Sequence, residues 1–389
     1  MSADRQDELL QRLAECIALP SITPPGDAAD VARWVESWAT DFGAAVTRQE
    51  VWPGADNVIA TLDFGDGPTL LLNSHMDVVD PSTQTWQTPP FVATPVGDRI
   101  HGRGTADAKG SLVAMLAAME RVAAARDGLR GRVVLTAVVA EEAGGLGTLH
   151  LAQQGIEADA AIVGEPTGLE IAYAHKGTYM RELVFHGAAA HSASPWLGRN
   201  AVADAAAFVL ASEQENRRLA QAPHPALGPG TMTVTKLAGG KLQNTVPAEA
   251  VLLVDRRLIP GETHAQCDRE LEAMLNTLRA ERPGLAVDAP RVVVNTVPSQ
   301  TDPQHPIVAA GLRAVGRVRG AEAAPVGFNA GCDMSKLVGA GIPTIICGPG
   351  SLAQAHGPDE FVPARELVDA ADIYESIITD VLTHEGSRR

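Results

Sequence analysis

Histidine and carboxylate residues follow three short apolar runs of this sequence. TLLLN precedes His75 and Asp77, VVLTAVVA precedes Glu141 and Glu142, and AAIVG precedes Glu165. If the runs are parallel strands, each delivers its polar residues past a carboxyl end, the edge where open α/β sheets collect ligands. The sequence therefore predicts that these side chains converge.

Two glycine-rich segments supply further candidate ligands. Asp107 lies in GRGTADAKG, where Gly102, Gly104 and Gly110 let the backbone turn where a side chain would obstruct it. His356 lies in GPGSLAQAHGPDE. Each residue has an ordinary alternative, since Asp can cap the helix expected after it and the histidine can be a simple loop residue.

The remaining motifs are also ambiguous when each is taken alone. His-x-Asp places His75 and Asp77 on one face of an extended segment, so Asp77 could orient the imidazole, yet the same spacing suits a surface turn. Glu141 and Glu142 should diverge at a strand end, one binding metal and one serving as general base, although a solvated acidic turn is the usual reading. Together, two His and three carboxylates suit two zinc-like ions bridged by one carboxylate.

The elements that would position these residues alternate between helix and strand. Apolar runs at 68–73, 132–140 and 160–164 are interleaved with helical patterns at 111–126 and 146–154, after two helical patterns at 5–18 and 27–42. This alternation predicts an α/β fold with a mainly parallel central sheet covered by helices.

The pattern changes at about residue 177. Strand and helix signals then follow the order βαββαβ, typical of a ferredoxin-like α+β unit, and the α/β pattern resumes after about residue 295. We therefore expect a catalytic domain formed by residues 1–176 and 295–389, interrupted by an inserted domain at 177–294.

Length and charge limit the function classes. A chain of 389 residues exceeds what one core usually supports, and its net charge of −16 would repel nucleic acid over most of the surface. The acidic amino terminus lacks signal-peptide features and no run reaches membrane-spanning length, so we expect a cytoplasmic protein without a membrane partner. Four scattered cysteines indicate reduced, mostly buried thiols. The glycines of GRG do not form a dinucleotide-binding motif.

Seven motifs together resemble the di-zinc amidohydrolase and metallopeptidase family that includes acetylornithine deacetylase, succinyl-diaminopimelate desuccinylase, aminoacylase and glutamate carboxypeptidase. The resemblance covers essentially the whole chain, through SHMDVV, GRGTADAKG, EEAGG, VGEPT, AHSASP, NTVPAEA with DRRLIPGE, and GPGSLAQAHGPDE.

The resemblance implies two divalent ions per chain, zinc or else cobalt. Asp107 would bridge them, Glu142 would join one ion with His75, and Glu165 would join the other with His356. Glu141 would be the general base. Asp77 would orient His75, and the peptide after Asp107 would be cis.

The inserted domain would be a lid through which a homodimer forms. There His191 resembles a histidine that reaches a partner's active site and stabilises the oxyanion, while Asn244 and Arg257 match substrate-contacting positions. Because Arg recognises carboxylates with a bidentate fork, Arg257 suits the α-carboxylate of an N-acyl-L-amino acid. The expected enzyme is an acetylornithine deacetylase-like deacylase acting on a small molecule. Succinyl-diaminopimelate desuccinylase, and dipeptidase or carboxypeptidase activity, are the alternatives, since GFNAGCDMSKL departs from the expected deacetylase pattern.

Overall fold

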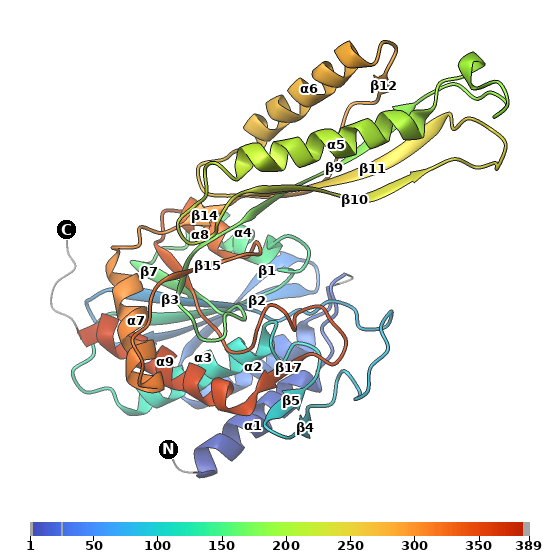
Figure 1. Cartoon of the computed structure of the whole chain (residues 1–389). Coiled ribbons are helices and arrows are strands. Elements are labelled where there is room, and N and C mark those ends of the chain that lie inside the picture. Colours follow the sequence, from blue (N-terminus) through green and yellow to red (C-terminus); the bar gives the residue numbers. More distant parts are fainter. Residues whose placement is uncertain (1–2, 25, 384–389) are drawn as a thin grey trace. The chain divides into compact units, whose positions relative to one another are not determined.

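The structure, a computed structural model, describes residues 3–24 and 26–383 (Figure 1). The chain divides into two compact units. The first contains residues up to Ala174, Gln300–Phe328 and the residues from Cys332 onward, and the second contains His175–Ser299 and Asn329–Gly331. Within the described residues, no helix is long and apolar enough to cross a membrane.

The first unit is built on a nine-stranded mixed sheet. Its order is β1 (Ala45–Trp52), β2 (Ala55–Asp63), β6 (Arg132–Val138), β3 (Thr69–His75), β7 (Ala160–Val163), β16 (Thr344–Ile346), β8 (Ala172–His175) and β14 (Ser299–Gln300), with β15 (Val326–Phe328) also on β8. The four central strands, β6, β3, β7 and β16, are parallel. The expected α/β fold is confirmed, and its parallel arrangement holds at the centre of the sheet.

The edges of this sheet are antiparallel. β1 and β2 form a hairpin that pairs with β6, and β16 pairs antiparallel with β8. The hairpin turns at Gly54, whose φ of 86° favours glycine. Because β1 is half exposed and carries polar residues, it lacks the apolar run that marks the central strands.

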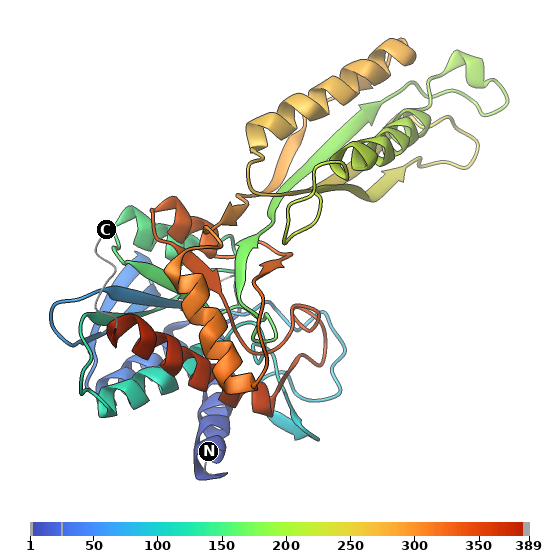
Figure 2. The same ribbon diagram turned by 60° about the vertical axis from the view of Figure 1, so that its left-hand side comes forward.

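Helices cover both faces of the central strands. They are α1 (Ala3–Ile17), α2 (Ala29–Asp41), α3 (Lys109–Ala124), α4 (Leu146–Gln153), α7 (Pro306–Arg319), α8 (Met334–Gly339) and α9 (Ala364–Thr383). α3 packs against α1, α9 and β3, and it lies beside α9 in both ribbon views (Figure 1, Figure 2). Its residues Lys109–Met119 are all buried, which explains why this helix is apolar almost all round.

Covering both faces also explains the sequence of β3. From Leu70 to His75 every residue is buried, so the strand is a continuous apolar run without alternation until it reaches its polar end. A small antiparallel sheet of β17 (Phe361–Pro363), β5 (Arg99–His101) and β4 (Thr94–Val96) lies in the same unit. It connects the segments that carry Asp107 and His356.

The second unit has the predicted βαββαβ order. Its elements are β9 (Gly177–His186), a 3₁₀ turn at Pro195–Leu197, α5 (Ala201–Leu219), β10 (Thr231–Gly239), β11 (Glu249–Leu258), α6 (His264–Glu281), β12 (Ala286–Val287) and β13 (Arg291–Thr296). The sheet order is β10-β11-β9, with β12 and β13 both on β9. The predicted last strand is split in two by Pro290, which cannot donate to a ladder.

One face of this second sheet is packed and the other is open. β11 alternates buried and half-buried residues, and its buried residues join α5 and α6 in one apolar cluster that includes Phe185, Phe208 and Leu271. The helices begin at capping side chains: Asn200 accepts from the amide of Ala203, and Thr263 accepts from the amide of Gln266. The half-buried face of β11 therefore remains available for function.

Candidate metal centre

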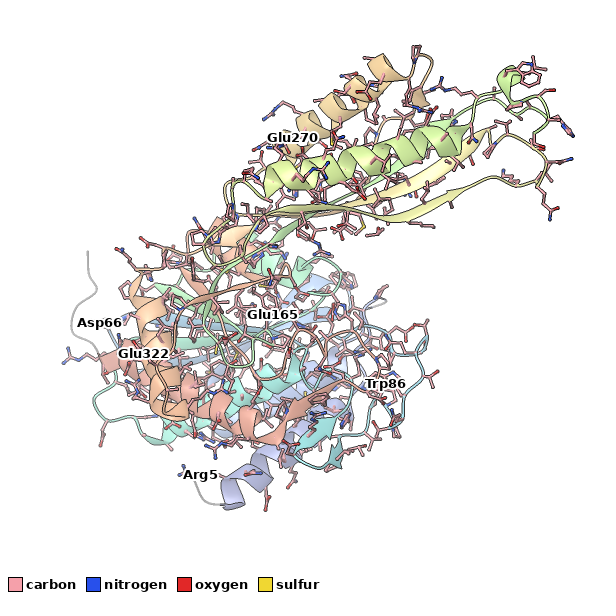
Figure 3. All side chains as sticks on the ribbon, viewed as in Figure 1. Arg5, Asp66, Trp86, Glu165, Glu270 and Glu322 are labelled. Carbon is pink, nitrogen blue, oxygen red and sulfur yellow. The ribbon has the colours of Figure 1, made fainter. Side chains whose placement is uncertain are left out.

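Candidate ligands gather at the carboxyl ends of the parallel strands. His75 is the last residue of β3 and pairs in register with Val138 of β6. Asn73 of β3 pairs with Val163 of β7, so Glu165 emerges at the same edge; Figure 3 shows it inside the first unit. The predicted convergence of these residues follows from the register of three neighbouring strands.

Asp107 lies between the two candidate histidines. Its Oδ1 is 3.0 Å from Nε2 of His75, and its Oδ2 is 3.4 Å from Nε2 of His356. The peptide bond from Asp107 to Ala108 is cis, as the resemblance implies. One carboxylate that presents a different oxygen to each of two histidines has the geometry of a bridging ligand.

The shortest contacts of the other two carboxylates differ from the expected pairing. His356 Nε2 is 3.0 Å from Glu142 Oε2, and His75 Nε2 is 3.9 Å from Glu165 Oε1. Glu165 follows β7 by only two residues, whereas Glu142 lies beyond a turn at Ala140, where φ is 56°. The turn carries Glu142 toward His356, the reverse of the pairing that the resemblance implies. Ligand atoms of His75, Asp107 and Glu142 still lie within 4.8 Å of one another, so the site is one cluster.

The carbonyl of Asp77, and not its side chain as expected, makes the shorter contact with the His75 ring. The ring nitrogen Nδ1 of His75 is 2.9 Å from the main-chain carbonyl of Asp77, and the Asp77 carboxylate is farther away at 3.7 Å. That carboxylate instead accepts hydrogen bonds from the amides of Glu141 and Glu142, at 3.1 and 3.2 Å. Asp77 therefore fixes His75 through its backbone and the Glu141–Glu142 segment through its side chain.

This cluster brings several carboxylates close together. In residues 3–24 and 26–383, no Lys or Arg forms an ion pair with Asp107, Glu141, Glu142 or Glu165. Burial raises the pKa of Glu165 well above its ordinary value, and the Asp107 and Glu141 carboxylates add to this. Buried like charges of this kind are stabilised by a bound cation.

The same negative charges also raise the pKa values of the two histidines. Burial lowers the pKa of His75, but its hydrogen bond with Asp107 and the surrounding carboxylates outweigh burial and raise the pKa well above its usual range. Hydrogen bonds to Asp107 and Glu142 raise the pKa of His356 to about 10. The carboxylates around the two imidazoles thus favour their protonated forms.

The donor set fits divalent metal ions. With Nδ1 of His75 donating to the Asp77 carbonyl, Nε2 is the nitrogen that would bind metal, and it already faces Asp107. Imidazole nitrogen combined with carboxylate oxygen suits zinc and its neighbours in the transition series. His356 has a more open position, its side chain being 58% exposed.

Glu141 is adjacent to the candidate ligands. Its carboxylate lies within 4.8 Å of ligand atoms of His75 and Glu165. Burial raises the pKa of Glu141 well above its ordinary value, and the charge of Asp333 raises it further. A carboxylate whose proton affinity is increased in this way is suited to general-base work.

The sequence did not identify the buried polar residues whose charges act on Glu141. Thr148 donates a 2.6 Å hydrogen bond to the buried Asp333, whose other oxygen is 3.3 Å from Nζ of Lys336. Asn73 of β3 donates to Thr148 at 3.0 Å. Asp333 and Lys336 lie in GFNAGCDMSKL, the segment whose departure from the deacetylase pattern was the one available signal.

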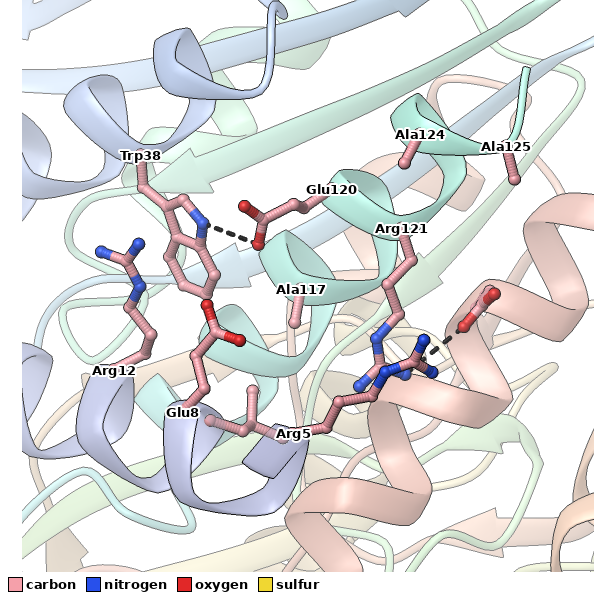
Figure 4. Close-up of a pocket in the computed structure, with 11 residues that line it drawn as sticks. Arg5, Glu8, Arg12, Trp38, Ala117, Glu120, Arg121, Ala124 and Ala125 are labelled. Atoms are coloured by element: carbon pink, nitrogen blue, oxygen red, sulfur yellow. Dashed lines mark hydrogen bonds and ion pairs between the residues drawn. The ribbon is translucent and has the colours of Figure 1, made fainter. Parts of the chain in front are cut away.

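A separate cavity in the first unit is remote from this chemistry. It has a volume of about 440 Å³ and is lined by α1, α2, α3 and α9, with Leu9, Trp38 and Ala117 among its walls (Figure 4). It follows α3 from Ala117 onward, about 12 Å along the helix from its first residue, Lys109. Arg121 in its wall is already paired with Glu375 at 3.3 Å.

The second unit contains the other three candidate residues in two places. His191 and Asn244 are exposed and belong to neighbouring loops, since His191 bridges to Thr245 and the amide of Ser192 donates to the carbonyl of Asn244 at 2.9 Å. Arg257 lies near the end of β11, opposite Thr178 of β9. At about 3.3 Å per residue, the stretch from Glu249 to Arg257 measures roughly 26 Å. The structure brings His191 and Asn244 together and leaves Arg257 apart from them.

Arg257 is held in place by an ion pair. Its Nε is 2.9 Å from Asp255 Oδ1, its Nη2 donates to Asp255 Oδ2 at 3.0 Å, and its Nη1 donates to Thr178 Oγ1 at 3.2 Å. The hydrogen bonds to Asp255 and Thr178 use two of the five guanidinium N–H groups, so others remain for a ligand.

Comparison with known proteins agrees with this fold. Residues 71–380 match the family described as Peptidase family M20/M25/M40. N-formyl-4-amino-5-aminomethyl-2-methylpyrimidine deformylase of Bacillus subtilis (strain 168) is 27% identical, with 99% of this chain and 96% of that protein covered. The solved structure of aminopeptidase PepT from Bacillus cereus ATCC 10987 gives a TM-score of 0.78 at 24% identity and covers 97% of this chain and 98% of the other. The M20 family metallo-carboxypeptidase Sso-CP2 from Sulfolobus solfataricus gives 0.76 at 22% identity, with coverages of 95% and 98%.

The chain belongs to the Peptidase M20/M25/M40 family, because the family match spans most of its length. It is a metal-dependent hydrolase of amide bonds, the class that the fold, the family and the carboxylate–histidine cluster define together.

Proposed function

We propose that this protein is a two-metal deacylase that hydrolyses the amide bond of N-acyl-L-amino acids. The observation that carries the proposal is Asp107, whose two oxygens face His75 and His356 separately. A buried carboxylate between two imidazoles suits two adjacent ions, most simply zinc, with cobalt as a functional substitute.

The distances support a definite division of ligands. His75 and Glu165 would hold one ion and His356 and Glu142 the other, with Asp107 shared by both. When bound, the ions would activate water and polarise the amide carbonyl.

Glu141 is the proposed general base. It would take the proton of the attacking water and return it to the leaving amine, for which its position beside the ligands and its raised pKa are suited. Asp77 would keep Glu141 in place, since it binds the Glu141 amide.

Deacylation is preferred over peptide cleavage for two reasons. In the family, members that remove N-acyl groups tend to have Glu at the position of Glu165, where several dipeptidase-like relatives have Asp. The Bacillus subtilis relative is itself named a deformylase. Arg257, which keeps N–H groups beyond its bonds to Asp255 and Thr178, would bind the α-carboxylate of the substrate.

The second unit is proposed as a lid that forms a homodimer. His191 and Asn244 lie roughly 26 Å or more along β11 from Arg257, too far apart to grip one small substrate together within a single chain. If His191 and Asn244 enter the neighbouring subunit's site, two copies together supply every residue. His191 would then donate to the oxyanion formed at the carbonyl.

A substrate panel tests this proposal. Metal-free protein would be reconstituted with zinc or cobalt and assayed with N-formyl, N-acetyl and N-succinyl amino acids beside dipeptides of matched side chains. We expect at least one acyl series to have the highest kcat/KM. Faster turnover of dipeptides throughout would replace the proposal with a dipeptidase, and preference for N-succinyl-diaminopimelate would identify a desuccinylase.

A further inference from the structure

Glu360 is a fully buried carboxylate that binds the backbone of the Asp107 loop. Its Oε1 accepts hydrogen bonds from the amides of Ala106 and Asp107, at 2.9 and 3.0 Å, and its Oε2 accepts from the amide of Gly104 at 3.1 Å. The amide of Gly102 donates to the Glu360 carbonyl at 2.9 Å. The bond to Asp107 acts on the backbone of the candidate bridging ligand itself.

Arg103 completes this arrangement. Its Nη1 is 2.7 Å from Glu360 Oε2, and both side chains are only 1% exposed. Its Nη2 donates to Gln84 Oε1 at 2.8 Å, and its guanidinium lies over the ring of Trp86 at 5.0 Å. Hydrogen bonds to a charged acceptor in a buried setting are stronger than neutral ones, so this contact is a rigid one.

The same group of residues reaches the His356 loop. Gln84 Nε2 donates to the main-chain carbonyl of His356 at 2.6 Å. β17, which begins at Phe361, pairs with β5, which ends at His101. The loops carrying Asp107 and His356 are therefore joined at the strand pair, at Glu360 and at Gln84.

The other candidate ligands have a different support. His75, Glu142 and Glu165 follow strands of the central sheet, and within the described residues their side chains form no hydrogen bond with Glu360, Arg103 or Gln84. Asp107 and His356 are thus the two candidate ligands whose mutual position depends on these three residues.

We propose that Glu360, together with Arg103 and Gln84, is a positioning group that holds Asp107 and His356 at a fixed separation and so sets the affinity for the ion that these two residues share. The inference rests on the proposed two-metal function. Glu360 touches neither substrate nor metal. It acts through the backbone of the Asp107 loop, as outer-sphere partners of metal ligands commonly do, at a typical cost of 10- to 100-fold in affinity when they are lost.

The first test uses Glu360→Gln. The amide of Gln would turn an NH₂ group toward N–H donors and leave the Arg103 charge unpaired, while the side-chain size stays the same. Zinc titration against a chelating dye should show one ion weakened by about 10- to 100-fold, the second ion changed far less. Hydrogen–deuterium exchange of the metal-free protein should show faster exchange at the amides of Gly104, Ala106 and Asp107.

Asp204→Asn is the matched control. Asp204 is an equally buried carboxylate, paired with Arg199 and Arg282 at 2.7 Å in the second unit. Its loss should lower the melting temperature without changing either zinc affinity. If Asp204→Asn weakens zinc binding as Glu360→Gln does, the effect is general destabilisation and the inference is wrong.

Gln84→Ala keeps the test valid if Glu360→Gln does not fold. This change removes only the connection between Arg103 and the carbonyl of His356. It should leave the melting temperature of the metal-free protein unchanged and weaken the same ion severalfold. Unchanged affinity for both ions in a folded variant would overturn the inference, whereas a wild-type protein that binds no divalent ion would overturn the proposed function instead.

Discussion

The two units of this protein hold their candidate functional residues in opposite ways. In the first, five candidate ligands and Glu141 meet at one sheet edge, mostly buried and joined by direct contacts. In the second, His191 and Asn244 are exposed on loops and Arg257 is far along β11. This difference is why we propose that one chain binds the metal ions, whereas two copies together supply the residues for substrate recognition and oxyanion stabilisation.

Removal of metal should cause the largest loss of turnover, and it distinguishes the two units because it disables the site of the first unit alone. Dialysis against a chelator should abolish turnover, and zinc or cobalt should restore it, with two ions bound per chain by elemental analysis. The melting temperature should rise again on adding metal, since the ions bind only the folded site. Full turnover in a sample verified to be metal-free would refute the two-metal mechanism.

Glu141→Gln should have the next largest effect. The change keeps size but removes basicity, so kcat should fall by roughly 10²–10⁴-fold while metal content stays near two ions per chain. Glu142→Gln is the matched comparison at the neighbouring residue, and it should reduce metal occupancy instead. If both variants lose metal equally, Glu141 is a ligand and the division between the two glutamates is wrong.

His191→Ala should reduce kcat by roughly 10²–10³-fold, the usual cost of one lost oxyanion donor, without changing metal content. His186→Ala is the control, because His186 is another exposed histidine of the same unit, paired with Asp288 at 2.9 Å. It should retain turnover.

A mixed dimer of His191→Ala and Glu141→Gln subunits decides which chain His191 serves. If it serves the partner, one of the two sites contains both an intact Glu141 and an intact incoming His191, so activity should return to at most about half of the wild-type value. If His191 serves its own chain, both sites keep one defect. A heterodimer as inactive as its parents would therefore remove the cross-subunit role.

The sequence was most informative where one physical pattern decides the structure. Apolar runs covered on both faces become central strands, and the residues after them must meet at one edge, so His75, Glu141 and Glu165 could be predicted. The antiparallel β1–β2 hairpin could not be predicted in the same way, because its half-exposed residues lack such a run.

Contacts between segments that are distant in the chain could not be predicted from the sequence. Glu360 accepts hydrogen bonds from the amides of residues more than 250 positions earlier in the chain. Nothing in its local sequence distinguishes it from a glutamate exposed on the surface. The pairing of Glu142 with His356 likewise depends on the direction of the turn at Ala140. His-x-Asp spacing suggested the Asp77 side chain as the partner of His75, but the main-chain carbonyl has that role.

Arg257→Lys should have the smallest effect and should act on binding alone. Lys keeps the charge but loses the planar fork, so the remaining contact to a carboxylate becomes a point charge. The KM for an N-acyl amino acid should rise, corresponding to a loss of about 1.5–3 kcal/mol in binding free energy, and kcat should change less. The same substrate with its carboxylate converted to an amide should bind wild type and variant alike. Arg291→Lys is the control, because Arg291 lies on β13 of the same sheet and is paired with Glu182 at 2.8 Å; this change should leave the KM for both substrates unchanged. If Arg257→Lys raises KM equally for the acid and the amide, Arg257 supports the open face of the sheet through Asp255 and Thr178, and the substrate carboxylate is recognised elsewhere.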